Sequence, residues 1–458
     1  MQLWLPLQEK SVNKMNTPIC DFVARYAGEN ALRLHMPGHK GKQLTGCEDK
    51  DITEIKGADS LYEADGIIAE SERNASYLFG CDTFYSTEGS SQCIRAMLYL
   101  VSLYAKLKGE KAVIAAARNV HKTFLSAVAM LDTDVQWLYG EGCSYLSCDI
   151  SADNLRKHFE EAENKPTAVY ITSPDYLGRI ADIRALSEVC KEFGSLLVVD
   201  NAHGAYLRFL SESRHPIDMG ADLCCDSAHK TLSVLTGGAY LHLNTSLPDF
   251  FRDNAKKALA FFGSTSPSYL ILQSLDKMNE VLDASYRSDL EACISEIRSL
   301  RNKLTEMGYS LYGDEELKIT LMTKSYGYNG NEFADILREK GIETEFADPD
   351  FVVMMFTPCL DETDTDRVCN VLSAIEKKPE IISDFPKMTL CRKVTDIRTA
   401  MLSVSETVKT QHCAGRVLAS ASVSCPPAVP VVMCGEEISE SAVKAFLYYG
   451  IDKCEVML

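Results

Sequence analysis

The chain has 458 residues, of which 46% are hydrophobic and 24% charged, so it is long enough for two or three domains with sizeable cores. The formal net charge of -18 argues against nucleic acid or an anionic membrane surface as a partner, because both bind clustered Lys and Arg. The same charge suits a soluble protein that attracts cationic ligands.

The cysteines and the first residues favour a reducing cytoplasm. The 17 cysteines are scattered and include no CxxC pair, which predicts neither a zinc site nor a disulfide framework. Residues 1–14 lack the basic start and apolar core of a signal peptide. No apolar stretch approaches the roughly 20 residues that span a bilayer. We therefore expect a cytoplasmic protein with no metal site and no membrane partner.

The first part of the chain predicts a helical arm and then a large α/β domain. Residues 1 to about 30 favour a short helical arm with Pro18 near its middle, and a loop rich in Pro, Gly and His follows over 34–41. From Ile67, helices and strands alternate, which is typical of an open, mostly parallel sheet. We expect helices over 67–79, 90–106, 121–130, 154–163 and 182–193, and strands over 83–86, 112–117, 135–138, 168–172, 196–200, 221–225 and 238–243.

The second part predicts a helical connection and a smaller α/β region. Residues from about 248 to 301 favour helix, with breaks at Gly263 and Pro267. Strands are expected over 317–322 and 352–356, and a helix over 332–340 that ends at Gly341. The whole pattern predicts three segments, which are an N-terminal arm and active-site segment (1–66), a large cofactor-binding domain (67–250), and a helical connection with a small C-terminal domain (251–458).

Two expected strand ends carry the clearest chemical signal. The apolar run 196–199 ends on Asp200, and the run 221–225 is followed closely by Lys230. A buried parallel strand that stops at a charged residue typically meets a ligand crevice at its carboxyl end. Pyridoxal phosphate (PLP) needs a lysine for a Schiff base and an acid at its ring nitrogen, so this pair predicts a PLP site. Taken singly, either residue could be a cap or a solvated surface group.

A run of small hydroxyl residues begins one of the expected helices. Ser90 and Ser91 follow Thr87-Glu88-Gly89 at the point where a strand gives way to a long helix. Such residues are commonly helix caps. The same geometry also offers backbone N–H groups and hydroxyls to a phosphate at the positive end of the helix.

Several motifs together resemble the Orn/Lys/Arg decarboxylase family of fold-type I PLP-dependent enzymes. The segments 199–204 (VDNAHG) and 227–232 (SAHKTL) are similar to the family's VDEAHG and SxHKTL signatures. The segments 37–40 (PGHK), 118–123 (RNVHKT) and 172–178 (TSPDYLG) are also similar to family motifs. The resemblance covers most of the chain and is strongest over 34–243. It implies the fold-type I α/β architecture, PLP as cofactor, and a homodimer or higher homo-oligomer whose sites are built from two chains.

The resemblance also implies residue roles. Lys230 would hold PLP as an imine, and Asp200 would keep the ring nitrogen protonated. His121 would stack on the ring, with Ala202 beneath it, and His203 completes the catalytic set. The residues implied as phosphate ligands are Ser90, Ser91, Ser227 and His229.

The implied substrate is a basic amino acid, decarboxylated to CO2 and a di- or polyamine precursor. Arginine, lysine and ornithine stay open, with arginine slightly favoured. A buried cation needs a carboxylate partner. The late Glu of the family is Ser420 here, so another acid must serve if the substrate is a simple basic amino acid. Asp59, in the early GxD motif, and Glu436, in the retained Gly435-Glu436 pair, are the candidates.

Departures from the family pattern leave two alternatives open. One is another fold-type I reaction such as transamination, which would form a keto acid in place of CO2. The other is a PLP-binding homologue with little catalysis, although the retained Asp200, His203 and Lys230 argue against it. The departures stand at Tyr62, Ala64, Glu88, Asp175, Ser420, Cys425, Ala428 and Cys434.

Overall fold

A central seven-stranded sheet organises the structure, a computed structural model that describes residues 15–142, 144–382, 385–386, 390–420 and 428–458. The strand order is β1-β7-β6-β5-β4-β2-β3, and β7 alone is antiparallel to its neighbours. The mostly parallel sheet expected from the sequence is therefore present. Its strands are β1 (Asp82–Ser86), β2 (Val113–Ala117), β3 (Asp134–Leu138), β4 (Ala168–Thr172), β5 (Leu196–Asp200), β6 (Leu223–Asp226) and β7 (Ala239–Leu243).

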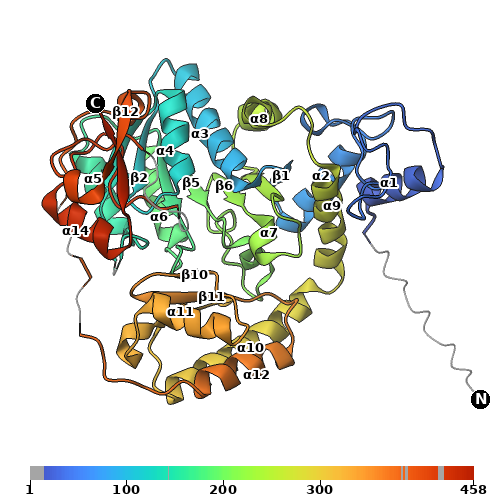
Figure 1. Ribbon diagram of the computed structural model, residues 1–458. Helices are drawn as coiled ribbons and strands as arrows, with labels where there is room; N and C mark the ends of the chain where they lie inside the picture. The colour runs from blue at the N-terminus through green and yellow to red at the C-terminus, as the bar shows by residue number, and fades with distance from the viewer. Residues whose placement is uncertain (1–14, 143, 383–384, 387–389, 421–427) are drawn as a thin grey trace, which may run out of the picture.

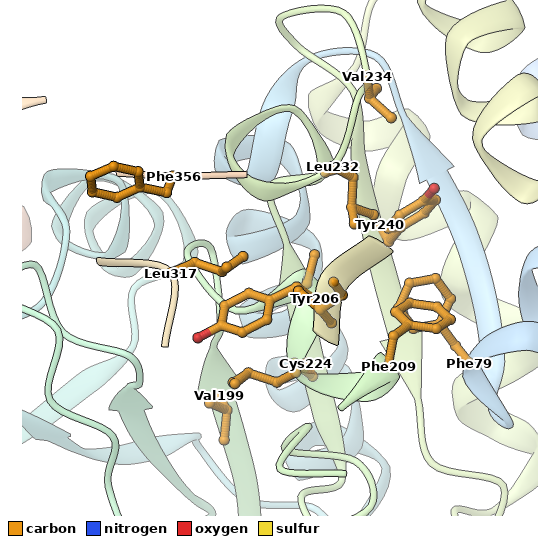
Figure 2. Packing of buried hydrophobic residues seen from close by; sticks show 14 of the residues in the cluster. Phe79, Val199, Tyr206, Phe209, Cys224, Leu232, Val234, Tyr240, Leu317 and Phe356 are labelled. Carbon is orange, nitrogen blue, oxygen red and sulfur yellow. The ribbon is translucent and has the colours of Figure 1, made fainter. Parts of the chain in front are cut away.

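The central strands are apolar along their length because both of their faces are buried. Successive side chains point to opposite faces, so Val198 packs in one core cluster and Val199 in the other. Figure 2 shows the second of these clusters, in which Val199 and Cys224 lie near the Tyr206 ring. The Phe79 and Phe209 rings pack edge to face there, with centroids 5.3 Å apart. Because both faces of these strands are packed, the strands hold the polar residues at their ends in defined positions.

Helices cover both faces of the sheet. On one face α3 packs against α4 and α8, and on the other lie α2, α5, α6, α9 and the 3-10 helix η2. The N-terminal helix α1 packs against α2 and α9. The bounds are α1 (Pro18–Gly28), η1 (Leu61–Glu63), α2 (Ile67–Phe79), α3 (Gly89–Leu107), α4 (Lys122–Leu131), α5 (Ala152–Glu161), α6 (Ile183–Phe193), η2 (Ala205–Phe209), α7 (Ala228–Thr231), α8 (Asp249–Phe262) and α9 (Tyr269–Ala284).

A smaller α/β layer lies below the large sheet in Figure 1. The long helix α10 leads into a four-stranded sheet of order β10-β11-β9-β8, whose strands are all antiparallel to their neighbours. Its elements are α10 (Tyr286–Glu306), β8 (Leu311–Tyr312), β9 (Lys318–Met322), η3 (Thr323–Tyr326), α11 (Gly330–Glu339), β10 (Phe346–Ala347), β11 (Phe351–Met355) and α12 (Glu362–Ser373).

The C-terminal residues form a further unit beside α4 and α5 (Figure 1). Helix α13 packs against α4, and the Arg398 side chain donates a hydrogen bond to the Ala129 carbonyl at 2.6 Å. The elements are α13 (Ile397–Met401), β12 (Ser405–Lys409), η4 (Thr410–His412), α14 (Glu440–Tyr448) and β13 (Lys453–Met457), with β12 and β13 paired antiparallel.

The structure differs from the sequence prediction in a few places. Pro18 begins α1 and does not lie within it, as suits a residue without an N–H group, and residues 1–14 lie outside the described residues. The breaks at Gly263 and Pro267 are confirmed between α8 and α9. Among the described residues, no helix is long and apolar enough to cross a membrane. The division at residues 66 and 250 stays a prediction.

Candidate active site

One cavity of about 320 Å³ lies where the carboxyl ends of β4, β5 and β6 meet the first turn of α3. Residues of the small sheet and of the C-terminal unit, Glu345 and Val429, also line it. The structure thus brings together side chains from distant parts of the sequence. The nine residues predicted for PLP that line this cavity are Ser90, Ser91, His121, Asp200, Ala202, His203, Ser227, His229 and Lys230.

Lys230 stands in the short helix α7, directly after β6, and its amine points to a neighbouring imidazole. Its Nζ lies 3.0 Å from Nε2 of His203. Burial lowers the pKa of Lys230, although the nearby carboxylates of Asp200 and Glu345 oppose the shift. Burial also lowers the pKa of His203 well below its ordinary value, and the Lys230 charge adds to this. The neutral imidazole can accept a hydrogen bond from the lysine amine and so hold it in place, while burial favours the neutral, nucleophilic form of that amine.

Asp200 ends β5 and is only 2% exposed. One carboxylate oxygen accepts a hydrogen bond from the Ala202 N–H at 3.2 Å, and the other accepts one from the Tyr170 hydroxyl at 3.2 Å. Burial raises the pKa of Asp200, and the Lys230 charge lowers it. A protonated ring nitrogen beside this carboxylate would add a second cation and favour the ionised form further.

Three serine hydroxyls gather at the N-terminus of α3. Ser227 donates to Ser90 at 2.7 Å, and the hydroxyls of Ser91 and Thr123 lie 3.1 Å apart. These groups stand at the positive end of α3, where an anion is favoured, and the Gly89 N–H there donates to the Gly237 carbonyl at 2.7 Å. Glu88 accepts a hydrogen bond from the Ser264 N–H and does not line the cavity, so its charge points away from the space at the start of α3.

The two histidines nearest these hydroxyls are fixed by hydrogen bonds. His121 caps α4, with its Nδ1 accepting from the Thr123 N–H at 3.2 Å. Burial, aided by the Lys230 charge, lowers the pKa of His121 to about 4, so the ring is neutral at pH 7. His229 donates from Nδ1 to the Gly238 carbonyl at 3.0 Å. The proton of the neutral ring is therefore on Nδ1, and Nε2 is the unprotonated nitrogen.

A fully buried charge network lies behind Ser227. One oxygen of Asp226 faces Nε2 of both His215 and His242 at 3.1 Å, and Asn201 donates to the other oxygen at 2.7 Å. Burial opposes ionisation, yet the two imidazoles hold the pKa of Asp226 well below its ordinary value. His215, Asp226 and Cys224 also have the donor atoms of a metal site within 4.8 Å of one another. The hydrogen bonds account for this arrangement of His215 and Asp226 without an ion.

The structure does not bring the two candidate substrate acids into the cavity of their own chain. Asp59 accepts hydrogen bonds from five backbone N–H groups at 2.9–3.3 Å and thereby organises the start of α2. Glu436 is buried in a two-bond ion pair with Arg118, at 2.8 and 3.2 Å. Both carboxylates are thus occupied within the fold. That either acid binds the substrate stays a prediction. It could hold only if the acid of one chain reaches the site of a partner chain.

Tyr176 and Glu345 are two residues of the cavity wall to which sequence reasoning assigned no role. Tyr176 lies inside the quoted TSPDYLG motif, but no role was assigned to it. Its ring meets the His203 ring edge to face, with centroids 5.2 Å apart, and its hydroxyl donates to Glu345 at 3.0 Å. Glu345 precedes β10 in the small sheet, so no local motif pointed to it. Cys425, one of the departures noted above, lies outside the described residues.

The residues present fit PLP. The cavity places an amine, a buried carboxylate and a hydroxyl-lined helix start around one space of about 320 Å³. These are the groups that the aldehyde, the ring nitrogen and the phosphate of PLP require. His203 also lines this space, and its buried Nδ1 has no hydrogen-bond partner among the described residues.

The fold and the cavity define the protein as a PLP-dependent enzyme of fold type I. Residues 17–320 match the family described as Orn/Lys/Arg decarboxylase, major domain, and residues 376–451 match the corresponding C-terminal domain. The chain belongs to the Orn/Lys/Arg decarboxylase family. It is accordingly a PLP-dependent decarboxylase of a basic amino acid.

Relatives align along nearly the whole chain. An arginine decarboxylase of Bacillus subtilis (strain 168) is 26% identical over 96% of this chain and 95% of its own length. An arginine decarboxylase of Bacillus anthracis is 25% identical over 94% and 92%. Among solved structures, lysine decarboxylase A from Pseudomonas aeruginosa gives a TM-score of 0.78 at 16% identity, covering 96% of this chain and 80% of that one. At that identity the structural likeness supports the fold alone.

Proposed function

We propose that the protein decarboxylates arginine, releasing CO2 and the corresponding amine, a polyamine precursor. The observation that carries this proposal is that relatives matching over almost their full lengths are named arginine decarboxylases. The net charge of -18 is consistent with a cationic substrate. A proton replaces CO2 at the α-carbon, so the reaction consumes one proton.

The cavity supports a set of residue roles. When bound, PLP supplies an acceptor for the electron pair left on the α-carbon as CO2 departs. Lys230 would form the covalent bond to the cofactor, and Asp200 would hold the proton on the ring nitrogen. His203, whose Nε2 lies 3.0 Å from the lysine amine, would accept a hydrogen bond from the amine and hold it in place. His121 and Ala202 would confine the ring between them.

The phosphate would lie at the first turn of α3. Ser90, Ser91 and Ser227 offer hydroxyl donors there, and the helix end offers backbone N–H groups and a positive field. His229 would add a charge when a phosphate dianion draws a proton to Nε2, because a nearby anion raises an imidazole pKa.

We also propose that the protein acts in the cytoplasm as a homodimer or higher homo-oligomer. Leu32, Leu34 and Leu44, in the segment after α1, are 83–84% exposed, and the proposal would bury them in the interface, since burial of apolar side chains favours association. All fifteen cysteines that the structure describes are free thiols, which suits a reducing compartment.

The test is a comparison of the purified enzyme on arginine, lysine and ornithine, with CO2 and keto acid measured together. We expect CO2 from arginine with a kcat/KM at least about tenfold above that for the other two, since a pocket shaped for one side chain discriminates by 1–3 kcal/mol. A preference for lysine or ornithine would contradict the assignment of arginine. Keto acid in place of CO2 would favour transamination.

A further inference from the structure

Glu345 stands where the small sheet meets the cavity. It immediately precedes β10, and its backbone N–H donates to the Val353 carbonyl of β11 at 2.9 Å, so the hairpin of β10 and β11 fixes its position. In Figure 1 β10 lies at the edge of the small sheet that faces the large domain. The Glu345 side chain is exposed and lines the same cavity as Lys230.

Among the described residues, Glu345 and Asp200 are the two carboxylates that line the cavity. The two carboxylates differ in whether an oxygen is left to accept a further hydrogen bond. Asp200 is deeply buried at the end of β5, where its two oxygens already accept from the Ala202 N–H and the Tyr170 hydroxyl. Glu345 uses only Oε1, which accepts from the Tyr176 hydroxyl at 3.0 Å. Its Oε2 has no hydrogen-bond partner within the described parts of the chain.

The charge of Glu345 acts inside the cavity. After burial and Asp200, it is the next largest influence on the pKa of Lys230, which it raises. A cation bound near the reacting lysine therefore lies in the field of Glu345. The other titratable side chains that line the cavity are three histidines, Tyr176 and Lys230 itself, and none of them is a carboxylate.

A guanidinium or ammonium group removed from water needs such a carboxylate. Unpaired burial of a cation is costly, and a carboxylate oxygen with an open acceptor position forms the strong, charge-assisted hydrogen bond that offsets it. The two acids suggested by the sequence are occupied elsewhere, by backbone N–H groups at Asp59 and by Arg118 at Glu436. Of these three acids, only Glu345 both lines the cavity and has a carboxylate oxygen without a hydrogen-bond partner among the described residues.

We propose that Glu345 binds the cationic end of the substrate side chain and that Tyr176 positions its carboxylate. This inference rests on the proposed function, because it presumes a basic amino acid as substrate. It assigns substrate selection to the small sheet, whereas the cofactor is held by the large one. Tyr176 is a positioning residue, since its hydroxyl acts through Oε1 of Glu345.

The test compares arginine with citrulline, its uncharged isostere, in wild type and in Glu345→Gln. We expect KM for arginine to rise by about 10- to 100-fold, since one charge-assisted hydrogen bond is lost, with kcat changed much less. The preference for arginine over citrulline should fall by a similar factor. Calorimetric binding of the decarboxylated amine of arginine should weaken equally, and this readout does not depend on turnover.

Two further variants separate charge from structure. Glu343→Gln removes an exposed carboxylate two residues earlier, which pairs with Arg338 at 3.3 Å and does not line the cavity, so it should leave KM unchanged. Tyr176→Phe keeps the ring against His203 but removes the hydroxyl, and should raise KM for arginine by a smaller factor than Glu345→Gln.

The outcomes distinguish the two proposals. If Glu345→Gln keeps the wild-type KM for arginine and the wild-type preference over citrulline, Glu345 does not bind the cation, whatever the reaction. If wild type instead releases no CO2 from arginine, lysine or ornithine, the proposed function fails before Glu345 is tested. An equal rise in KM in Glu343→Gln would also overturn the assignment, because it would show a general charge effect.

Discussion

Several donors surround the Asp200 carboxylate. A substitution that keeps the shape of this side chain should therefore leave most of the surrounding structure in place. The Ala202 N–H and the Tyr170 hydroxyl donate to separate oxygens, and the Cys225 thiol lies 3.7 Å from one of them. In Asp200→Asn the amide keeps one acceptor oxygen, and the tyrosine hydroxyl can turn to accept from the amide nitrogen. The fold and the cavity should therefore survive.

Asp200→Asn should bind PLP but lose at least about 100-fold in kcat. A neutral amide cannot hold the proton on the ring nitrogen, and this stabilisation matters more in the transition state than in the ground state. Steady-state kinetics with absorbance titration of the cofactor measures both quantities. An unchanged kcat in a variant that is saturated with PLP would show that Asp200 does not have this role.

The residues that support the site were less accessible to sequence reasoning than the site itself. Asp200 and Lys230 were predicted because each follows an apolar strand and carries a charge. Tyr170 was placed in a strand, but nothing in its surroundings indicated that its hydroxyl holds Asp200. Glu345 lies in another sheet, and only the packing of the two layers brings it to the cavity.

At the scale of elements, β9 is attached to the large domain by two hydrogen bonds, and one of them comes from a lysine that also forms a buried ion pair within the small domain. Lys318 and Glu315 are at most 1% exposed, with Nζ and Oε2 2.7 Å apart. Lys318 also donates to the Asp175 carbonyl at 3.2 Å, and Thr320 donates to the Leu177 carbonyl at 2.8 Å. Strand β9 thus holds the loop that carries Tyr176.

Lys318→Met should lower the free energy of unfolding by about 3–5 kcal/mol, because it leaves the Glu315 carboxylate buried without a partner. The double variant Lys318→Met with Glu315→Leu should recover most of that loss, since both charges are removed together. Chemical denaturation of the three proteins gives the comparison. A single variant within about 0.5 kcal/mol of wild type would show that the pair is not buried as described.

Helix ends were predicted best where a glycine changes the backbone conformation. Gly80 ends α2 and Gly194 ends α6, both with φ near +70°, a conformation that glycine adopts without strain. Of the strands that the prediction missed, β13 alternates exposed and buried residues, whereas three others have weaker signals. β8 and β10 have two residues each, too few for an alternating pattern, and β12 is largely exposed.

At the scale of the whole molecule, the active site is an assembly of three regions. The large domain supplies Asp200, His203 and Lys230 to the cavity, the small sheet supplies Glu345, and the C-terminal unit supplies Val429. Ala428, beside it, has a φ of +60°, which is unusual outside glycine. The class of fold was predictable from alternating elements, whereas the meeting of these regions depends on tertiary packing.

The central claim is that Lys230 and bound PLP carry out decarboxylation in this cavity. The most direct measurement is CO2 release from arginine by wild type and Lys230→Ala, together with visible absorbance and thermal unfolding. We predict that wild type releases CO2 and shows the absorbance band of lysine-bound PLP, and that Lys230→Ala loses both while it stays folded. Normal CO2 release by Lys230→Ala, with its absorbance band retained, would contradict the account.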